Sequence, residues 1–179
     1  MVNTNKDLSY FQLSEKIREK AKKIKFVLTD SDGVLTDTGV FYSESGEALK
    51  RFSIRDGMGV ERLKKVAGIP TGIITGESSD AVKRRAEKLE ISDLYLFCKD
   101  KLAKLKIILV EKNLFAEEIA YIGDDYNDLE IISAVGLSAC PNDAMNLVKE
   151  SVDFICENKG GNGAFREFAE MIINSKQEK

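Results

Sequence analysis

The sequence predicts a doubly wound α/β fold, in which helices cover both faces of a parallel sheet. Three observations support this fold class. Short apolar runs alternate with segments of helical periodicity along most of the chain. Three of these runs end close to residues that can bind a ligand, namely Asp30, Thr75 and Asp124, and ligands of such sheets bind at the carboxyl ends of the strands. With 179 residues, 43% of them hydrophobic, the chain is also long enough to form one domain with a proper core.

The first part of the chain contains an expected helix, a strand and a hairpin. Apolar residues near helical spacing between Leu8 and Lys23 predict a helical extension over residues 1–23. The run from Ile24 to Thr29 is apolar and β-rich, and it stops abruptly at acidic residues, which indicates a buried strand. A turn-like segment then separates two β-rich runs, so we expect a hairpin at about residues 40–54. Because it interrupts the alternation, this hairpin is a candidate flap.

After the hairpin, helices and strands alternate regularly. Each expected helix carries apolar residues three or four apart, and each expected strand is a short apolar run bounded by turn residues. No internal repeat or low-complexity linker divides the chain, so we expect residues 24–179 to form a single domain. The expected helices cover residues 58–67, 78–89, 101–112, 129–134 and 143–149, and the expected strands cover 69–75, 94–97, 119–122, 135–139 and 154–156.

The bulk composition argues against several classes of function. A net charge of −3 disfavours a nucleic-acid partner held by a basic face. No apolar stretch approaches the ~20 residues that span a bilayer, and the N-terminus lacks the apolar core of a secretory signal. The three cysteines form no C-x-x-C pair and resemble reduced thiols. We therefore expect a cytoplasmic protein without a membrane or nucleic-acid partner.

Acidic residues follow two of the predicted strands. Asp30 and Asp32 stand one residue apart after the first strand, and Asp124 and Asp125 follow the strand at 119–122. Two carboxylates so close together repel each other, and they stay ionised together most easily when a cation lies between them. The two strand ends therefore predict one site for a hard cation with oxygen ligands.

Two further pieces stand at the ends of predicted elements. Thr75 and Gly76 offer a hydroxyl and exposed amides where a helix opens, which is a seat for an anion. Lys101 opens the next helix, where the helix dipole disfavours a cation unless an anion lies close. The chain contains no histidine, so any acid–base chemistry must fall to Asp, Glu, Lys, Cys or Tyr.

Together these motifs resemble those of the haloacid dehalogenase superfamily of phosphatases. The family pattern is D-x-D-G, a Ser or Thr at a strand end, a Lys, and G-D-D. This chain carries it, in family order, as Asp30-Ser31-Asp32-Gly33, Thr75, Lys101 and Gly123-Asp124-Asp125. The resemblance implies a Rossmann-like fold and a phosphoric monoester hydrolase that uses Mg²⁺.

The resemblance also implies a role for each residue. Asp30 attacks phosphorus and forms an aspartyl phosphate, and Asp32 protonates the leaving oxygen and then activates water. Thr75 and the Gly76 amide hold the phosphoryl oxygens while Lys101 neutralises their charge.

The same resemblance implies which atoms bind the metal. The side chains of Asp30 and Asp124 and the carbonyl oxygen of Asp32 supply the protein ligands of Mg²⁺. Asp128, four residues after Asp124, either orients the metal shell or caps the next helix.

A narrower resemblance covers residues 24 to 172. The segments 29–37, 52–57, 72–76, 120–125 and 160–167 look like those of the capless sugar-acid phosphatases, which act on 3-deoxy-manno-octulosonate 8-phosphate or on 2-keto-3-deoxynononate (KDN) 9-phosphate. The segments between the motifs are too short for a cap domain. In this branch a homotetramer closes each site, because the flap and the glycine-rich tail of one subunit reach its neighbour.

Markers of the substrate disagree with one another. Eight-carbon enzymes usually carry Arg at the position of Glu77, whereas Glu77 with Lys88 resembles the nine-carbon enzymes. Arg85 and Lys88 share a helix flank that could offer a guanidinium fork to a carboxylate. We favour KDN 9-phosphate, with 3-deoxy-manno-octulosonate 8-phosphate of lipopolysaccharide precursor synthesis as the alternative, since Arg55-Asp56-Gly57 resembles the eight-carbon enzymes. The residues expected to bind substrate are Asp32, Ser53, Ile54, Arg55, Asp56, Gly57, Thr75, Gly76, Glu77, Arg85, Lys88 and Lys101.

Two hypotheses without phosphatase activity compete with this one. Similar domains occur as silent assembly modules fused to sugar-acid cytidylyltransferases, but every catalytic motif position is filled here. Receiver domains of two-component signalling also pair acids near a first strand. The hairpin after Asp32 and the Gly-Asp-Asp that ends a later strand argue against a receiver domain.

Overall fold

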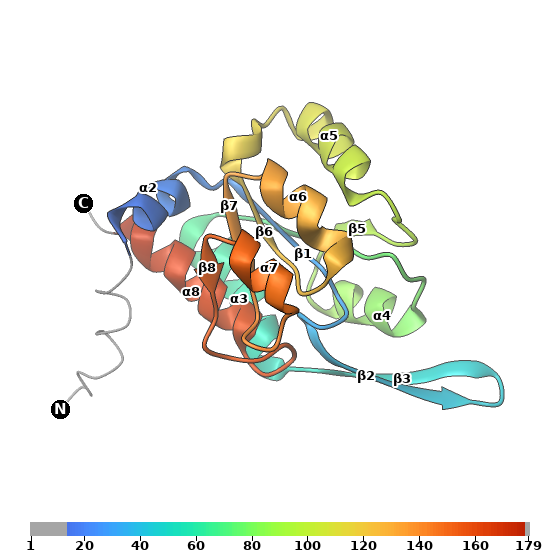
Figure 1. Ribbon diagram of the computed structural model, residues 1–179. Coiled ribbons are helices and arrows are strands. Elements are labelled where there is room, and N and C mark those ends of the chain that lie inside the picture. The colour runs from blue at the N-terminus through green and yellow to red at the C-terminus, as the bar shows by residue number, and fades with distance from the viewer. Residues whose placement is uncertain (1–13, 178–179) are drawn as a thin grey trace.

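In the computed structural model, which describes residues 14–177, a six-stranded parallel sheet forms the centre of the molecule (Figure 1). Its strand order is β5-β4-β1-β6-β7-β8, and every neighbouring pair is parallel. This confirms the predicted doubly wound fold. The chain moves outward in one direction from β1 to β4 and β5, and in the other from β1 to β6, β7 and β8. The strands are β1 (Phe26–Thr29), β4 (Thr71–Ile74), β5 (Asp93–Tyr95), β6 (Ile119–Ile122), β7 (Leu137–Cys140) and β8 (Phe154–Ile155).

Helices cover both faces of the sheet, and each face has its own apolar core. Strands β1, β4, β6 and β7 are buried along their whole length, which explains why they are near-continuous apolar runs without alternation. On one face, α2 (Glu15–Lys23), α3 (Ile54–Ala67), α4 (Asp80–Lys88) and α8 (Ala164–Gln177) enclose one core. On the other, α5 (Lys101–Lys112), α6 (Leu129–Ala134) and α7 (Asn146–Ser151) enclose the second.

The N-terminal helix packs against the C-terminal one. Ala21 of α2 is fully buried in the core that α8 lines, and Lys20 forms an ion pair of 2.5 Å with Asp153. The predicted start of this helix at Leu8 lies outside the described residues. Among residues 14–177, no helix combines the length and the apolar character that crossing a membrane requires.

The hairpin after β1 forms a separate two-stranded sheet that projects from the body of the molecule (Figure 1). Its strands are β2 (Thr36–Ser43) and β3 (Gly46–Phe52). The prediction of a hairpin was right, but its limits of about 40–54 were wrong. The second strand ends at Phe52 because the Ser53 side chain accepts a hydrogen bond from the Asp56 amide and so caps α3.

Candidate active site

The topology brings three predicted site residues to one edge of the sheet. Strand β1 lies between β4 and β6, with Thr29 opposite Ile73 on one side and Ile122 on the other. The residues that follow these strands, Asp30, Thr75 and Asp124, therefore gather at the point where the strand order reverses. Ligands of open α/β sheets bind at such a switch point.

The carboxyl groups of Asp30, Asp124 and Asp128 form a tight cluster. One oxygen of each lies within 4.8 Å of the others. Burial, followed by the charge of Asp128, raises the pKa of Asp30 to about 7, although Lys101 opposes the shift. Burial and the charges of Asp30 and Asp128 raise the pKa of Asp124 to about 8. Three carboxylates in this space repel one another, and a divalent cation would relieve that repulsion.

The geometry of the loop after β1 explains why the D-x-D-G motif ends in glycine. Gly33 has a φ of +81°, and a Cβ atom on it would lie 1.9 Å from Oδ2 of Asp124. Only glycine therefore lets the loop after β1 approach the carboxylate at the end of β6. This close approach brings the backbone of the Asp30–Gly33 loop and the Asp124 side chain to one cation site.

Asp128 holds the lysine of the site in place. Its Oδ1 accepts hydrogen bonds from Nζ of Lys101 at 2.5 Å and from the hydroxyl of Tyr121 at 2.6 Å. Its Oδ2 accepts from the amides of Asp124 at 2.9 Å and Asp125 at 3.3 Å. Both oxygens are therefore engaged, and the side chain makes no cap of α6. Of the two roles that the sequence left open for Asp128, this geometry favours orientation of the site.

Lys101 is buried between two acids. Its side chain is 2% exposed, and Nζ lies 2.9 Å from Oδ2 of Asp30. Because its neighbours are carboxylates, the pKa of Lys101 is raised despite burial. The predicted cation at the start of α5 thus points at the predicted nucleophile. Tyr121, which supports Asp128, was missed by the sequence analysis, and the available signal was a hydroxyl in an otherwise apolar buried strand.

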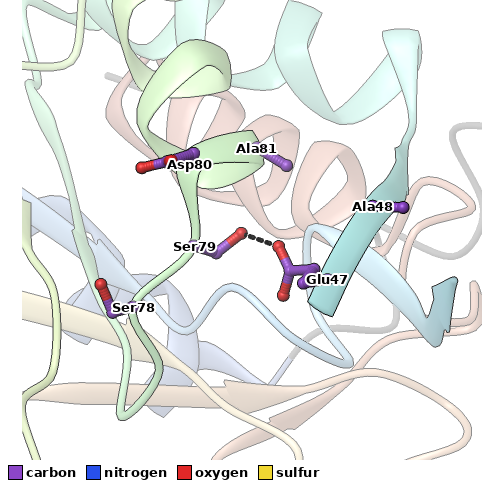
Figure 2. Close-up of a pocket in the computed structure, with 6 residues that line it drawn as sticks. All are labelled: Glu47, Ala48, Ser78, Ser79, Asp80 and Ala81. Carbon is purple, nitrogen blue, oxygen red and sulfur yellow. Dashed lines mark hydrogen bonds between the residues drawn. The ribbon is translucent and has the colours of Figure 1, made fainter. Parts of the chain in front are cut away.

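The hairpin contributes a second buried lysine that the sequence analysis missed. Nζ of Lys50 lies 2.7 and 2.9 Å from the two carboxylate oxygens of Asp32 and 3.3 Å from Glu47. Its side chain is 2% exposed. Glu47 also accepts a hydrogen bond from Ser79, the cap of α4, and these residues line a pocket of about 260 Å³ together with Asp80 (Figure 2). The flap is therefore fastened to the body of the same chain at both Asp32 and α4.

Thr75 and Gly76 follow β4 at the same edge of the sheet as Asp30. Thr75 is 2% exposed, and its hydroxyl accepts a hydrogen bond from the Glu77 amide at 3.3 Å. Glu77 itself is exposed and pairs with Lys99 at 3.1 Å. Thr75 was predicted to end the strand, which stops at Ile74, and the role of Thr75 and Gly76 as a seat for an anion stays a prediction.

Several residues predicted to bind substrate make contacts within the fold. Ser53 caps α3, and Asp56 accepts hydrogen bonds from the amides of Gly163 at 3.1 Å and Arg166 at 3.0 Å, so it caps α8. A Cβ on Gly57 would lie 2.3 Å from the Arg85 guanidinium. The Arg55-Asp56-Gly57 motif thus joins α3 to α8 and α4 within the chain.

The guanidinium group of Arg85, which was predicted to bind a carboxylate, contacts other parts of the chain. Arg85 donates to the carbonyl oxygen of Ser53 at 2.7 Å and lies over the Phe52 ring. Lys88, Ile54 and Arg55 are exposed.

The glycine-rich segment packs against the loop after β1 of the same chain. The Gly161 amide donates to the carbonyl oxygen of Val34 at 2.8 Å, and a Cβ on Gly160 would lie 1.9 Å from the Gly33 oxygen. This segment therefore supports the loop that carries Asp32.

The chain is similar to known proteins in sequence and in fold. Residues 98–168 match the family model of haloacid dehalogenase-like hydrolases. The chain is 39% identical over 160 residues to the 3-deoxy-D-manno-octulosonate 8-phosphate phosphatase of Haemophilus influenzae, covering 89% of this chain and 88% of that protein. A cobalt-bound structure of the Haemophilus influenzae phosphatase matches with a TM-score of 0.85 and 39% identity, covering 88% of this chain and 91% of that one.

A further solved structure bears on the ligands. The phosphatase of the same name from Moraxella catarrhalis, in complex with a magnesium ion, a phosphate ion and the sugar acid KDO, matches with a TM-score of 0.87 and 37% identity. The match covers 90% of this chain and 92% of that one. The carboxylate cluster described above has the ligand type that such a hard cation requires.

Proposed function

This chain belongs to the haloacid dehalogenase-like hydrolases and is a phosphatase of that family, and we propose that it hydrolyses 3-deoxy-D-manno-octulosonate 8-phosphate. The observation that carries the proposal is the buried group in which Lys101 lies 2.9 Å from Asp30 and 2.5 Å from Asp128 at the switch point of the sheet. The similarity to eight-carbon phosphatases supports this substrate better than the nine-carbon one that Glu77 and Lys88 favoured.

The residues of the site fit a magnesium ion held by the Asp30 and Asp124 side chains, with the Asp32 carbonyl as a third protein ligand. Burial and the neighbouring carboxylates raise the pKa of Asp30 to about 7 and that of Asp124 to about 8, and a cation bound between them would stabilise their ionised forms. When bound, the ion would neutralise charge on the transferring phosphoryl group. Asp128 orients this group through the amides of Asp124 and Asp125 and through Lys101.

Each protein residue then has a task in the reaction. Asp30 attacks phosphorus in line and carries the phosphoryl group as an aspartyl phosphate. Asp32 gives its proton to the leaving sugar oxygen and later takes one from the attacking water. Thr75 and the Gly76 amide hold phosphoryl oxygens, and Lys101 balances their negative charge as it develops. Lys50 keeps the Asp32 carboxyl group in position through both of its oxygens.

We further propose that the chain works as a homotetramer in which the flap reaches a neighbouring subunit. The flap exposes Phe41, Tyr42 and Leu49, with 64%, 76% and 65% of each residue accessible. Apolar side chains gathered on a projecting arm favour contact with a second protein surface.

Phosphate release from the eight-carbon and the nine-carbon ester tests the substrate, with magnesium and after its removal by a chelator. We expect hydrolysis of the eight-carbon ester, loss of activity with the chelator, and recovery when Mg²⁺ is restored. Asp30→Asn should reduce turnover by roughly 10⁴-fold or more, because no other residue can carry the phosphoryl group. A preference for the nine-carbon ester would restore the substrate that Glu77 indicated, and inactivity on every ester would indicate an assembly module.

A further inference from the structure

The loop after β5 is fixed to the loop after β4 beyond the end of the strands. The Cys98 amide donates to the carbonyl oxygen of Thr75 at 2.9 Å, and the Phe97 amide donates to that of Glu77 at 3.2 Å. These bonds extend the contact between β4 and β5. They place Nζ of Lys99 3.6 Å from the position that a Cβ on Gly76 would occupy. The ammonium group therefore lies beside the proposed phosphate seat.

The neighbouring residue Phe97 contacts the ammonium group of Lys99. Nζ of Lys99 lies 5.5 Å from the centre of the Phe97 ring, within range of a cation–π contact. Phe97 has a φ of +54° and is 70% exposed. A bulky residue rarely adopts this backbone conformation, and such strain gathers at functional sites.

The partner of Lys99 is weakly held. Its ammonium group lies 3.1 Å from Oε1 of Glu77, and the two side chains are 64% and 66% exposed. Ion pairs as exposed as this contribute little to stability, so an incoming anion can replace Glu77.

Three other cations of the site are committed to buried or internal groups. Lys101 is held by Asp30 and Asp128, and Lys50 by Asp32. Arg85, the cation that the sequence indicated for the substrate carboxylate, donates to a backbone carbonyl oxygen. Lys101 and Lys50 are paired with carboxylates of the site and Arg85 with a backbone carbonyl oxygen, whereas Lys99 is paired only with an exposed carboxylate.

We propose that Lys99 binds the carboxylate of the sugar-acid substrate, and that Glu77 holds its place while the site is empty. The exchange replaces one carboxylate by another on the same ammonium group, and the exposed Glu77 side chain turns to solvent. This inference rests on the proposed function and adds a specificity-determining residue to it. It also gives Glu77 a task that does not depend on the nine-carbon substrate.

The test compares two esters on the same variants. One is 3-deoxy-D-manno-octulosonate 8-phosphate, which carries the carboxylate, and the other is p-nitrophenyl phosphate, which does not. Lys99→Met should raise KM for the sugar-acid ester about tenfold, the value of a lost hydrogen bond between charged groups. The kcat/KM for the sugar-acid ester divided by that for p-nitrophenyl phosphate should fall by the same factor. Lys99→Arg should restore this ratio, and kcat for the sugar-acid ester should change little in either variant.

Lys106→Met serves as the matched control. Lys106 is an exposed lysine within α5, close in sequence to Lys99, and it has no part in the proposal. Its ratio should equal that of the parent chain. Glu77→Gln removes the competing carboxylate and should lower KM for the sugar-acid ester. An unchanged ratio in Lys99→Met overturns the inference and leaves the proposed function intact. Failure of the parent chain to hydrolyse the sugar-acid ester overturns the proposed function, and the inference with it.

Discussion

At the centre of the site Lys101 and Asp128 are almost completely buried and each bonds two or more partners, whereas at the rim Lys99 and Glu77 keep about two thirds of their side chains exposed and bond each other. The centre is attached to strands β1 and β6 and to the start of α5. The rim is attached to loops that follow β4 and β5. Chemistry common to a family requires fixed distances, while recognition of one substrate requires groups that can exchange partners.

The largest expected effect comes from weakening the ion pair between Asp128 and Lys101 in the centre. Asp128→Asn keeps the shape of the side chain but removes the charge that holds Lys101. We expect kcat to fall by about 10²-fold, since the group that neutralises the phosphoryl oxygens would lose its position. Steady-state kinetics with the sugar-acid ester would measure the effect. Tyr121→Phe removes the hydroxyl that bonds Asp128 and Lys101 but leaves their ion pair in place, so it should cost less than Asp128→Asn. Equal kcat in the parent and in Asp128→Asn would contradict the role given to Asp128.

Sequence reasoning reached the centre more completely than the rim or the flap. Asp30, Asp32, Thr75, Lys101 and Asp124 stand at the ends of periodic elements, and the parallel sheet brings such ends together whatever their separation along the chain. The Asp56 cap of α8 joins residues 107 positions apart, so no local pattern reveals it.

The buried lysine of the flap escaped the analysis for a related reason. Lys50 stands in a strand whose neighbours are mostly exposed, and its sequence context is that of a solvated surface. Only the fold of the hairpin back onto the D-x-D-G loop places it against Asp32. Contacts made by an arm that packs on a distant loop depend on tertiary structure and leave no periodic signal.

Magnesium affinity should depend on pH, because the centre holds protons that the cation must displace. The pKa values of about 7 for Asp30 and about 8 for Asp124 lie above those of ordinary carboxyl groups, so the metal-free protein is protonated there below neutral pH. Apparent affinity should therefore rise with pH, by up to about tenfold per pH unit for each proton released, and level off above pH ~8. Titration calorimetry in buffers of different ionisation enthalpy would count those protons. Affinity independent of pH between 6 and 8 would show that the cluster is already ionised.

The smallest expected effect concerns Lys50. This residue belongs to the flap, but it contacts Asp32 of the catalytic centre. Lys50→Met removes the two contacts that hold Asp32, and we expect kcat to fall about tenfold, a fraction of the 10²- to 10⁴-fold that general acid–base catalysis supplies. KM should change little, since Lys50 bonds Asp32 and Glu47 and has no contact assigned to substrate. Lys50→Arg should recover part of the loss, and Lys83→Met, a change at an exposed lysine of α4, should have no effect on kcat. If Lys50→Met raises KM and leaves kcat unchanged, Lys50 of the flap contributes to substrate binding. It would then have no part in holding the Asp32 carboxyl group for catalysis.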